Sequence, residues 1–148
     1  MTERPSWETY FMGICDQVAT RSTCIRRSVG AIIVKDNRIL ATGYNGAPSG
    51  LEHCADVGCY RQANNIPSGT MAEACRGIHA EQNAIIQAAK YGIPINGSVL
   101  YCTTFPCSIC AKMIINAGMS QVIYRFGYDD GLSKKLFQES GIPMRLVA

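Results

Sequence analysis

Long apolar runs and runs of like charge are both missing from this sequence of 148 residues. Its longest unbroken apolar runs, such as 31–34, are far shorter than the ~20 residues needed to span a bilayer. The first residues are polar and no apolar segment follows them, so we expect no signal peptide and a cytoplasmic location. Internal repeats and low-complexity segments are also absent. With 47% hydrophobic residues, the sequence predicts a single globular domain over residues 1–148.

A clustered basic surface is missing too. The net charge is only +3, and the Lys and Arg residues are scattered along the chain. Proteins that bind polymeric DNA or RNA usually carry a concentrated basic face. We therefore expect neither a nucleic-acid polymer nor a membrane as a partner, whereas a small anionic ligand would need only one or two well-placed basic residues.

Cysteine, in contrast, is abundant, with eight copies. Without a secretory signal, a reduced and metal-binding set is a better interpretation than disulfides. Cys15 and Cys102 fall within predicted regular elements and are expected to be inert core thiols. Residues 45–75 are rich in Gly, Pro, Asn and Ser, with little periodicity. A Cys-rich loop insert of about thirty residues is unusual in a compact domain unless it is functional or tied down.

Hydrophobic periodicity and turn residues predict alternating helices and strands. A first helix would begin after Ser6 as N-cap and reach residue 19, and Asp36-Asn37 indicates a hairpin turn. The other predicted elements are strands at 29–34, 39–42, 99–103, 122–125 and 144–147, and helices at 79–91, 107–117 and 132–140. This order predicts an α/β fold, a three-layer α/β/α sandwich around a five-stranded mixed sheet.

Two short motifs carry metal ligands. His79-Ala80-Glu81 is followed by Pro106-Cys107-Ser108-Ile109-Cys110. Structural zinc is normally closed by four protein ligands, whereas catalytic zinc keeps three and leaves one position open. His79, Cys107 and Cys110 supply three ligands, and Glu81 is not needed as a fourth. The pattern His-x-Glu…Pro-Cys-x-x-Cys is typical of zinc deaminases.

The spacing of these residues suits this chemistry. Cys107 and Cys110 stand one helical turn apart, so both sulfurs can reach one ion. Each motif opens a predicted helix, whose positive end favours thiolates. Glu81 would transfer protons between water and a pyrimidine ring as general acid and base. Cys107-x-x-Cys110 alone could also be a redox pair or half of a structural zinc knuckle, but a structural zinc has no use for Glu81.

Beyond these motifs the chain resembles the deoxycytidylate (dCMP) deaminases of the cytidine deaminase superfamily. The resemblance covers nearly the whole sequence and includes segments 21–24, 29–31, 43–46 and 79–85. It implies a cytidine deaminase-like fold, a catalytic Zn²⁺, and hydrolytic deamination of dCMP to dUMP, which supplies thymidylate synthesis. Many members are hexamers regulated by dCTP and dTTP, so it also implies a homo-oligomer and these two effectors.

The same resemblance implies four substrate contacts. Asn45 would bind the nucleotide, the Ala80 N–H would meet the pyrimidine O2, Arg26 would lie near the phosphate, and Tyr128 would line the substrate side. From the residues alone, Asn45 could be only a turn residue, Arg26 a solvated arginine, and Tyr128 a core or interface aromatic. Some members carry a basic residue after this tyrosine, where this chain has Asp129.

Four further cysteines lie in or beside irregular chain and predict a second, structural Zn²⁺: Cys24, Cys54, Cys59 and Cys75. A closed tetrahedral site would tie down the long insert. Some dCMP deaminases carry a second zinc, and Cys24 and Cys54 match ligand positions there. Cys59 and Cys75 differ from the His and acidic ligands seen in part of the family, so their assignment depends on thiolate chemistry alone. His53 is the alternative candidate ligand. Unpaired buried thiols or an adventitious disulfide are the alternative.

Two other classes of function remain open from the sequence. One is deamination of another amino-heterocycle, such as tRNA adenosine, guanine or a riboflavin-pathway pyrimidine. The weak basic character and the Cys-rich insert argue against tRNA. The other is a catalytically silent, zinc-stabilised binding module, which would be marked by loss of Glu81 or of a zinc ligand, and all four residues are present.

Overall fold

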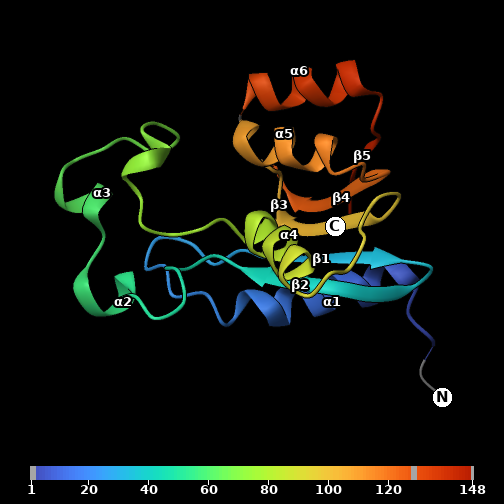
Figure 1. Ribbon diagram of the computed structural model, residues 1–148, viewed down its shortest axis with the longest axis horizontal. Coiled ribbons are helices and arrows are strands. Elements are labelled where there is room, and N and C mark those ends of the chain that lie inside the picture. Colours follow the sequence, from blue (N-terminus) through green and yellow to red (C-terminus); the bar gives the residue numbers. More distant parts are fainter. Residues whose placement is uncertain (1–2, 128–129, 148) are drawn as a thin grey trace.

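The computed structural model describes residues 3–127 and 130–147. A five-stranded sheet lies at its centre, with the strand order β2-β1-β3-β4-β5 (Figure 1). The strands are β1 (Gly30–Lys35), β2 (Arg38–Tyr44), β3 (Val99–Thr104), β4 (Gln121–Phe126) and β5 (Met144–Leu146). Strand β1 is antiparallel to β2 and β3, whereas β3, β4 and β5 are parallel. The predicted mixed sheet is therefore confirmed.

Four long helices cover the sheet: α1 (Trp7–Ala19), α4 (Ala80–Lys90), α5 (Ser108–Asn116) and α6 (Gly131–Ser140). Alternate residues of β1 point to opposite faces, as the pleat requires. Ile32 and Val34 pack with the buried residues of α1, and Ala31 and Ile33 pack with α4 and α5. The three predicted layers are thus present, with α6 packed against α5 (Figure 1).

Helix α1 begins as predicted, because the Ser6 hydroxyl accepts a hydrogen bond from the Thr9 N–H at 3.2 Å. The 3.6-type spacing of Trp7, Phe11, Ile14 and Val18 predicts that these residues form its buried stripe, and this is wrong for Trp7. Trp7 is 48% exposed and stacks on Phe11 at 5.5 Å instead. The buried residues of α1 are Phe11, Met12, Cys15 and Ala19, whereas Ile14 and Val18 are partly buried and pack against the same cluster.

The β1–β2 hairpin turns at Asp36 and Asn37, which have φ angles of 53° and 58°. Two consecutive residues with positive φ are the signature of a type I′ turn, so this prediction is confirmed. Strand β2 has a glycine where α4 crosses it. A Cβ atom on Gly43 would lie 2.2 Å from the Ala80 carbonyl oxygen and 2.5 Å from the Ala84 nitrogen. On the other face, a Cβ on Gly30 would lie 2.2 Å from the Cys15 carbonyl oxygen of α1.

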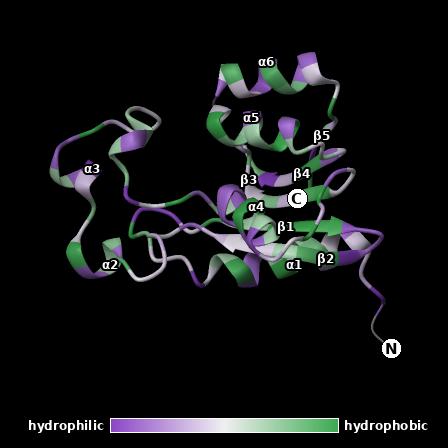
Figure 2. Cartoon of the chain, viewed as in Figure 1, coloured by the Kyte–Doolittle hydropathy of each residue, from purple (hydrophilic) through white to green (hydrophobic). Residues whose placement is uncertain are grey.

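The insert projects beyond one end of the sheet (Figure 1). It contains three short helices where an irregular loop was predicted: α2 (Cys54–Val57), α3 (Tyr60–Ala63) and the 3-10 helix η1 (Ala72–Ala74). Hydrophobic residues gather along the central strands, whereas the insert mixes hydrophobic and hydrophilic residues (Figure 2). Gly46 and Ile78 pair at the base of the insert, through N–H···O bonds of 3.2 and 2.7 Å. Across the described ranges, no helix combines the length and apolar character needed to cross a membrane.

Candidate catalytic metal site

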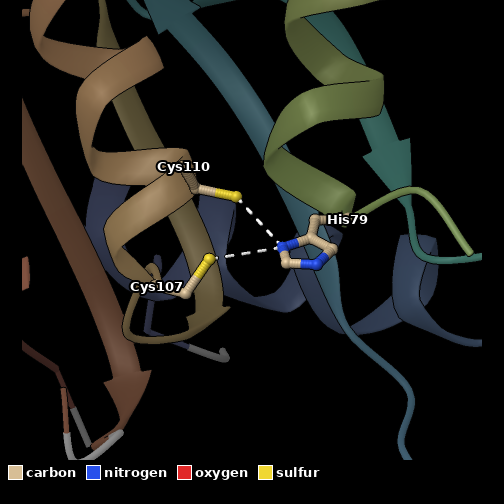
Figure 3. Close-up of side chains that lie close together, drawn as sticks. All are labelled: His79, Cys107 and Cys110. Carbon is tan, nitrogen blue, oxygen red and sulfur yellow. Dashed lines mark hydrogen bonds between the residues drawn. The ribbon is translucent and has the colours of Figure 1, made fainter. Parts of the chain in front are cut away.

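The predicted metal ligands meet at the first turns of two helices on the same face of the sheet. His79 is the N-cap of α4, Cys107 is the N-cap of α5, and Cys110 lies in the first turn of α5. Their side chains point toward one another (Figure 3). The His79 Nδ1 atom lies 3.2 Å from the Cys110 Sγ and 3.4 Å from the Cys107 Sγ. All three ligand atoms lie within 4.8 Å of one another, so one ion can contact them all.

Local hydrogen bonds explain why His79 stands where it does. The Gly46–Ile78 pair ties the residue before His79 to the end of β2. The Gln82 side chain then turns back to accept a hydrogen bond from the His79 backbone N–H at 2.9 Å. This is one half of a capping box, which fixes the entry of the chain into the helix. The backbone that carries the imidazole is therefore fixed by the strand pairing before it and by the bond to Gln82 after it.

The two sulfurs differ in their protonation. The Cys110 thiol donates to Cys107, which is the main reason that the pKa of Cys107 falls to about 4, with His79 adding to the effect. The same hydrogen bond, together with burial, raises the pKa of Cys110. The pKa of His79 is raised by its hydrogen bond to Cys107, although burial opposes this. One thiolate is thus favoured even without a metal, and ion binding would displace the remaining protons.

Glu81 lies beside this cluster and is 4% exposed. Burial raises the pKa of its carboxyl, while a hydrogen bond with Cys110 and the charge of His79 act in the opposite direction. A carboxyl whose pKa is moved toward neutrality can both accept and donate a proton near physiological pH. The position and burial of Glu81 are compatible with a general acid and base, and this role stays a prediction.

The donor set fits zinc. Two cysteine sulfurs and one imidazole nitrogen are the ligands that Zn²⁺ prefers, and three protein ligands leave a fourth position for another molecule. A cavity of about 300 Å³ opens beside these ligands and is lined by His79, Glu81 and Cys107 among others. The arrangement is that of a catalytic zinc site with room for a small substrate.

A model of a known protein family matches residues 5–126 of the chain, described as the cytidine and deoxycytidylate deaminase zinc-binding region. The chain belongs to the cytidine and deoxycytidylate deaminase family. The matched residues include the three predicted zinc ligands and Glu81. It ends before α6, which lies outside the matched residues.

Relatives of this chain include proteins with two different names. Deoxycytidylate deaminase of Schizosaccharomyces pombe is 38% identical over 143 residues, which are 96% of this chain and 44% of the yeast protein. The chain thus spans less than half the length of that relative. ComE operon protein 2 of Bacillus subtilis is 43% identical over 146 residues, 98% of this chain and 73% of that protein.

Solved structures of similar proteins support the same fold. The dCMP deaminase from cyanophage S-TIM5, in complex with dCMP and dUMP, matches this chain with a TM-score of 0.79 and 33% sequence identity. The match covers 99% of this chain and 100% of the phage protein. The fold is therefore that of the cytidine deaminase-like proteins, as predicted.

Three of the four predicted substrate contacts line the cavity: Arg26, Asn45 and Ala80. The Asn45 side chain is already bonded to backbone, since its Oδ1 accepts from the Val29 N–H at 2.9 Å and its Nδ2 donates to the Arg27 carbonyl at 3.1 Å. An amide has two N–H donors, so one remains for a ligand. Tyr128 and Asp129 lie outside the described residues.

The four cysteines of the predicted second zinc site line the same cavity: Cys24, Cys54, Cys59 and Cys75. The pKa of Cys54 is raised by burial first and then by the negative charge of the other three sulfurs. Three of the sulfurs accept a backbone N–H two or three residues later: Cys24 from Arg26 (3.4 Å), Cys59 from Gln62 (3.5 Å) and Cys75 from Gly77 (3.4 Å). Among the described residues, however, only His79, Cys107 and Cys110 form a group with all ligand atoms within 4.8 Å.

Two polar residues of the site were not predicted from the sequence. Arg61 is 8% exposed and lines the cavity, with its guanidinium donating to the carbonyls of Pro67 at 2.7 Å and Met71 at 2.8 Å. Asp130 also lines the cavity, and its carboxylate accepts from the backbone N–H groups of Ser108 and Ser133. Asp130 before a predicted helix is a recognisable N-cap signal, whereas nothing in the local sequence indicates the partners of Arg61.

Proposed function

We propose that this deaminase converts dCMP and water to dUMP and ammonia, a reaction that supplies thymidylate synthesis. The observation that carries the proposal is the set of His79, Cys107 and Cys110 beside the buried Glu81 in a cavity for a small molecule. The choice of dCMP is supported by similarity along nearly the whole chain to the phage enzyme whose structure contains dCMP and dUMP. The proposed substrate class is a small nucleotide.

The proposed roles follow from the chemistry of each residue. When bound by His79, Cys107 and Cys110, Zn²⁺ supplies a Lewis acid that lowers the pKa of water to around 7. Glu81 takes one proton from the attacking water and passes it to the ring nitrogen as the C–O bond forms. It then takes the remaining proton of the added hydroxyl group and gives it to the amino group, which leaves as ammonia when the C–N bond breaks. Ala80 is the first residue of α4, so its N–H has no acceptor within the helix and is free to bind the pyrimidine O2.

The phosphate is proposed to lie near Arg26. This arginine is exposed on its segment and lines the cavity, and guanidinium groups bind phosphate oxygens in a bidentate manner. Asn45 would hold the nucleotide through its remaining N–H. The assignment of Tyr128 to the substrate side is part of the same proposal and depends on the family resemblance.

A substrate panel tests the proposal. Release of ammonia would be measured from dCMP, CMP, deoxycytidine, cytosine and guanine, with the E81Q variant as the control for contaminating activity. We expect dCMP to give the highest kcat/KM, and R26A to lower it for dCMP more than for deoxycytidine. Equal kcat/KM for dCMP and deoxycytidine would reject phosphate recognition. Zinc-loaded protein that deaminates none of the five would favour a binding module instead.

The second, structural Zn²⁺ is proposed to be held by Cys24, Cys54, Cys59 and Cys75. The support is that they lie around one cavity and that backbone N–H groups point at three of the sulfurs, as they do when thiolates need stabilisation. Metal analysis should give two zincs per chain, falling to one in a C54S/C59S double mutant and staying at two in C15A. One zinc in the wild type, with these four thiols freely titratable, would reject the second site.

Assembly and regulation complete the proposal. Exposed aromatic side chains on α1, Trp7 at 48% and Tyr10 at 47%, offer a surface for a homo-oligomer such as a hexamer. The dCTP and dTTP effectors and the cytoplasmic location rest on the family resemblance and on the reduced thiols. Light scattering with and without each triphosphate, together with the rate of deamination, tests assembly and regulation.

A further inference from the structure

The two helices that hold the metal ligands share an unusual start. Each begins with a ligand as its N-cap, His79 for α4 and Cys107 for α5. An N-cap side chain normally accepts a hydrogen bond from an N–H of the first helical turn. Cys107 makes no such bond, and its sulfur lies against the His79 Nδ1 instead. In this structure, helix α5 is therefore not capped by the side chain of its own N-cap residue.

Asp130 supplies the acceptor that α5 lacks. Its Oδ2 accepts the backbone N–H of Ser108, the first residue of α5, at 3.0 Å. Its Oδ1 accepts the backbone N–H of Ser133 at 3.0 Å, which caps α6. One carboxylate thus lies at the N-termini of both helices, where the partial positive charges of two helix dipoles stabilise it.

A second bond from the first turn of α6 reaches the other side of Cys107. The Ser133 hydroxyl donates to the Pro106 carbonyl at 2.7 Å, and Ser133 is fully buried. The residues immediately before and after Cys107 are therefore both held by α6. This helix follows the region matched by the family model, which ends at residue 126.

We infer that Asp130 and Ser133 are positioning residues for the metal ligand Cys107. Asp130 acts through Ser108 and Ser133 acts through Pro106, and together they fix the backbone from which the Cys107 sulfur is presented. Outer hydrogen bonds of this kind commonly change metal affinity by about 10–100-fold when they are removed. The inference concerns the zinc site and is independent of which amino-heterocycle is the substrate.

The competing explanation is that Asp130 only caps its own helix. The D130N variant separates the two roles, because asparagine is as good an N-cap as aspartate but has a single acceptor oxygen. Asparagine can cap α6 through Ser133, but its NH₂ group would then face the Ser108 N–H. A residue that only caps α6 would tolerate this change, whereas a bridge between α5 and α6 would not.

The test measures zinc affinity directly, by competition with a chromogenic chelator, in D130N, D130A, S133A and the wild type. S140A is the matched control, since it removes the serine hydroxyl that donates to the Phe137 carbonyl at the far end of α6. We expect D130N, D130A and S133A to bind zinc about 10–100-fold more weakly, and S140A to match the wild type. Urea unfolding of the metal-free proteins accompanies each measurement.

Each remaining outcome is decisive. Wild-type zinc affinity in D130N would overturn the inference and leave Asp130 as a cap of α6 alone. A loss of affinity in S140A as large as in S133A would also overturn it, because α6 would then act only through general stability. If D130A does not fold, D130N and S133A still decide the matter. Failure to deaminate dCMP would reject the proposed substrate but would not alter these zinc affinities.

Discussion

Replacement of Gly43 by alanine should displace the helix that carries the predicted catalytic residues. Gly43 lies on β2 under the first turn of α4, which carries His79, Ala80 and Glu81. The new methyl group would lie 2.2 Å from the Ala80 carbonyl oxygen, whereas ordinary van der Waals contact begins at 3.4 Å. The methyl group would also lie 2.5 Å from the Ala84 nitrogen. Because this nitrogen and the Ala80 oxygen both belong to the backbone of α4, the helix must move away by about 1 Å, at a cost of about 1–3 kcal/mol in stability.

This shift of α4 would move His79 and Glu81 as well as the residues that pack against the sheet. A misplacement of about 1 Å can reduce turnover about 100-fold. We therefore expect G43A to lose about two orders of magnitude in kcat/KM, with weaker zinc binding because His79 moves away from Cys107 and Cys110. Steady-state ammonia release and chelator competition measure the two effects separately, and circular dichroism with urea unfolding measures the stability.

Two other glycines provide matched controls. G30A introduces the same 2.2 Å clash, but with the Cys15 carbonyl of α1 on the opposite face of the sheet. It should lose comparable stability while keeping turnover per folded molecule within a few-fold of wild type. G13A meets nothing within 4 Å and replaces a helical glycine, so it should gain up to about 1 kcal/mol. If G43A and G30A lost equal stability and had equal activity, the proposed displacement of α4 would be refuted.

Three further results are expected. E81Q should retain its fold and zinc but lose at least about 10²–10⁴ in kcat, and a variant above a tenth of wild-type kcat would contradict the role of Glu81 as acid and base. R61A should raise KM about tenfold with a smaller change in kcat. The reason is that the cavity wall formed by residues 67–71 loses two hydrogen bonds that the charged guanidinium donates. An unchanged KM would show that this wall does not contact the substrate. Burial raises the pKa of Cys15 from 9.0 to about 12, so the folded state keeps a proton that the unfolded state loses. Stability should therefore fall as the pH rises from 9 to 12, by up to about 1.4 kcal/mol per unit, and urea unfolding of C15A should show a shallower fall.

The parts of the structure that the sequence predicted well depend on local spacing. The hairpin at Asp36-Asn37 follows from two residues that tolerate positive φ, and the meeting of His79 with the Cys-x-x-Cys pair follows from a motif with fixed geometry. Helices and strands of six or more residues carried enough periodicity to be found. The four-residue helices of the insert did not, because a single turn shows no repeat.

What the sequence did not predict depends on contacts between distant segments. Trp7 was predicted in the buried stripe of α1 but is 48% exposed, because the buried side of a helix is decided by the elements it packs against and not by its own spacing alone. The bonds of the Asn45 side chain to the backbone of Arg27 and Val29 were not predicted, because only folding brings these segments together, and its contact with a nucleotide stays a prediction. The bond from Ser108 to Asp130 likewise joins two helices and has no signature in either one.

The paired backbone of Gly46 and Ile78 makes the insert a module that could be exchanged. Its two ends are pinned together where the chain leaves β2 and enters α4, so its length is decoupled from the position of His79. Lengthening a loop whose ends are already joined costs only a logarithmic increment of entropy, about 0.6 kcal/mol per doubling. Related enzymes can therefore diverge in this segment, which forms one wall of the cavity, while the chemistry beneath it is inherited unchanged. Substrate preference and catalysis would then evolve on separate parts of one small chain.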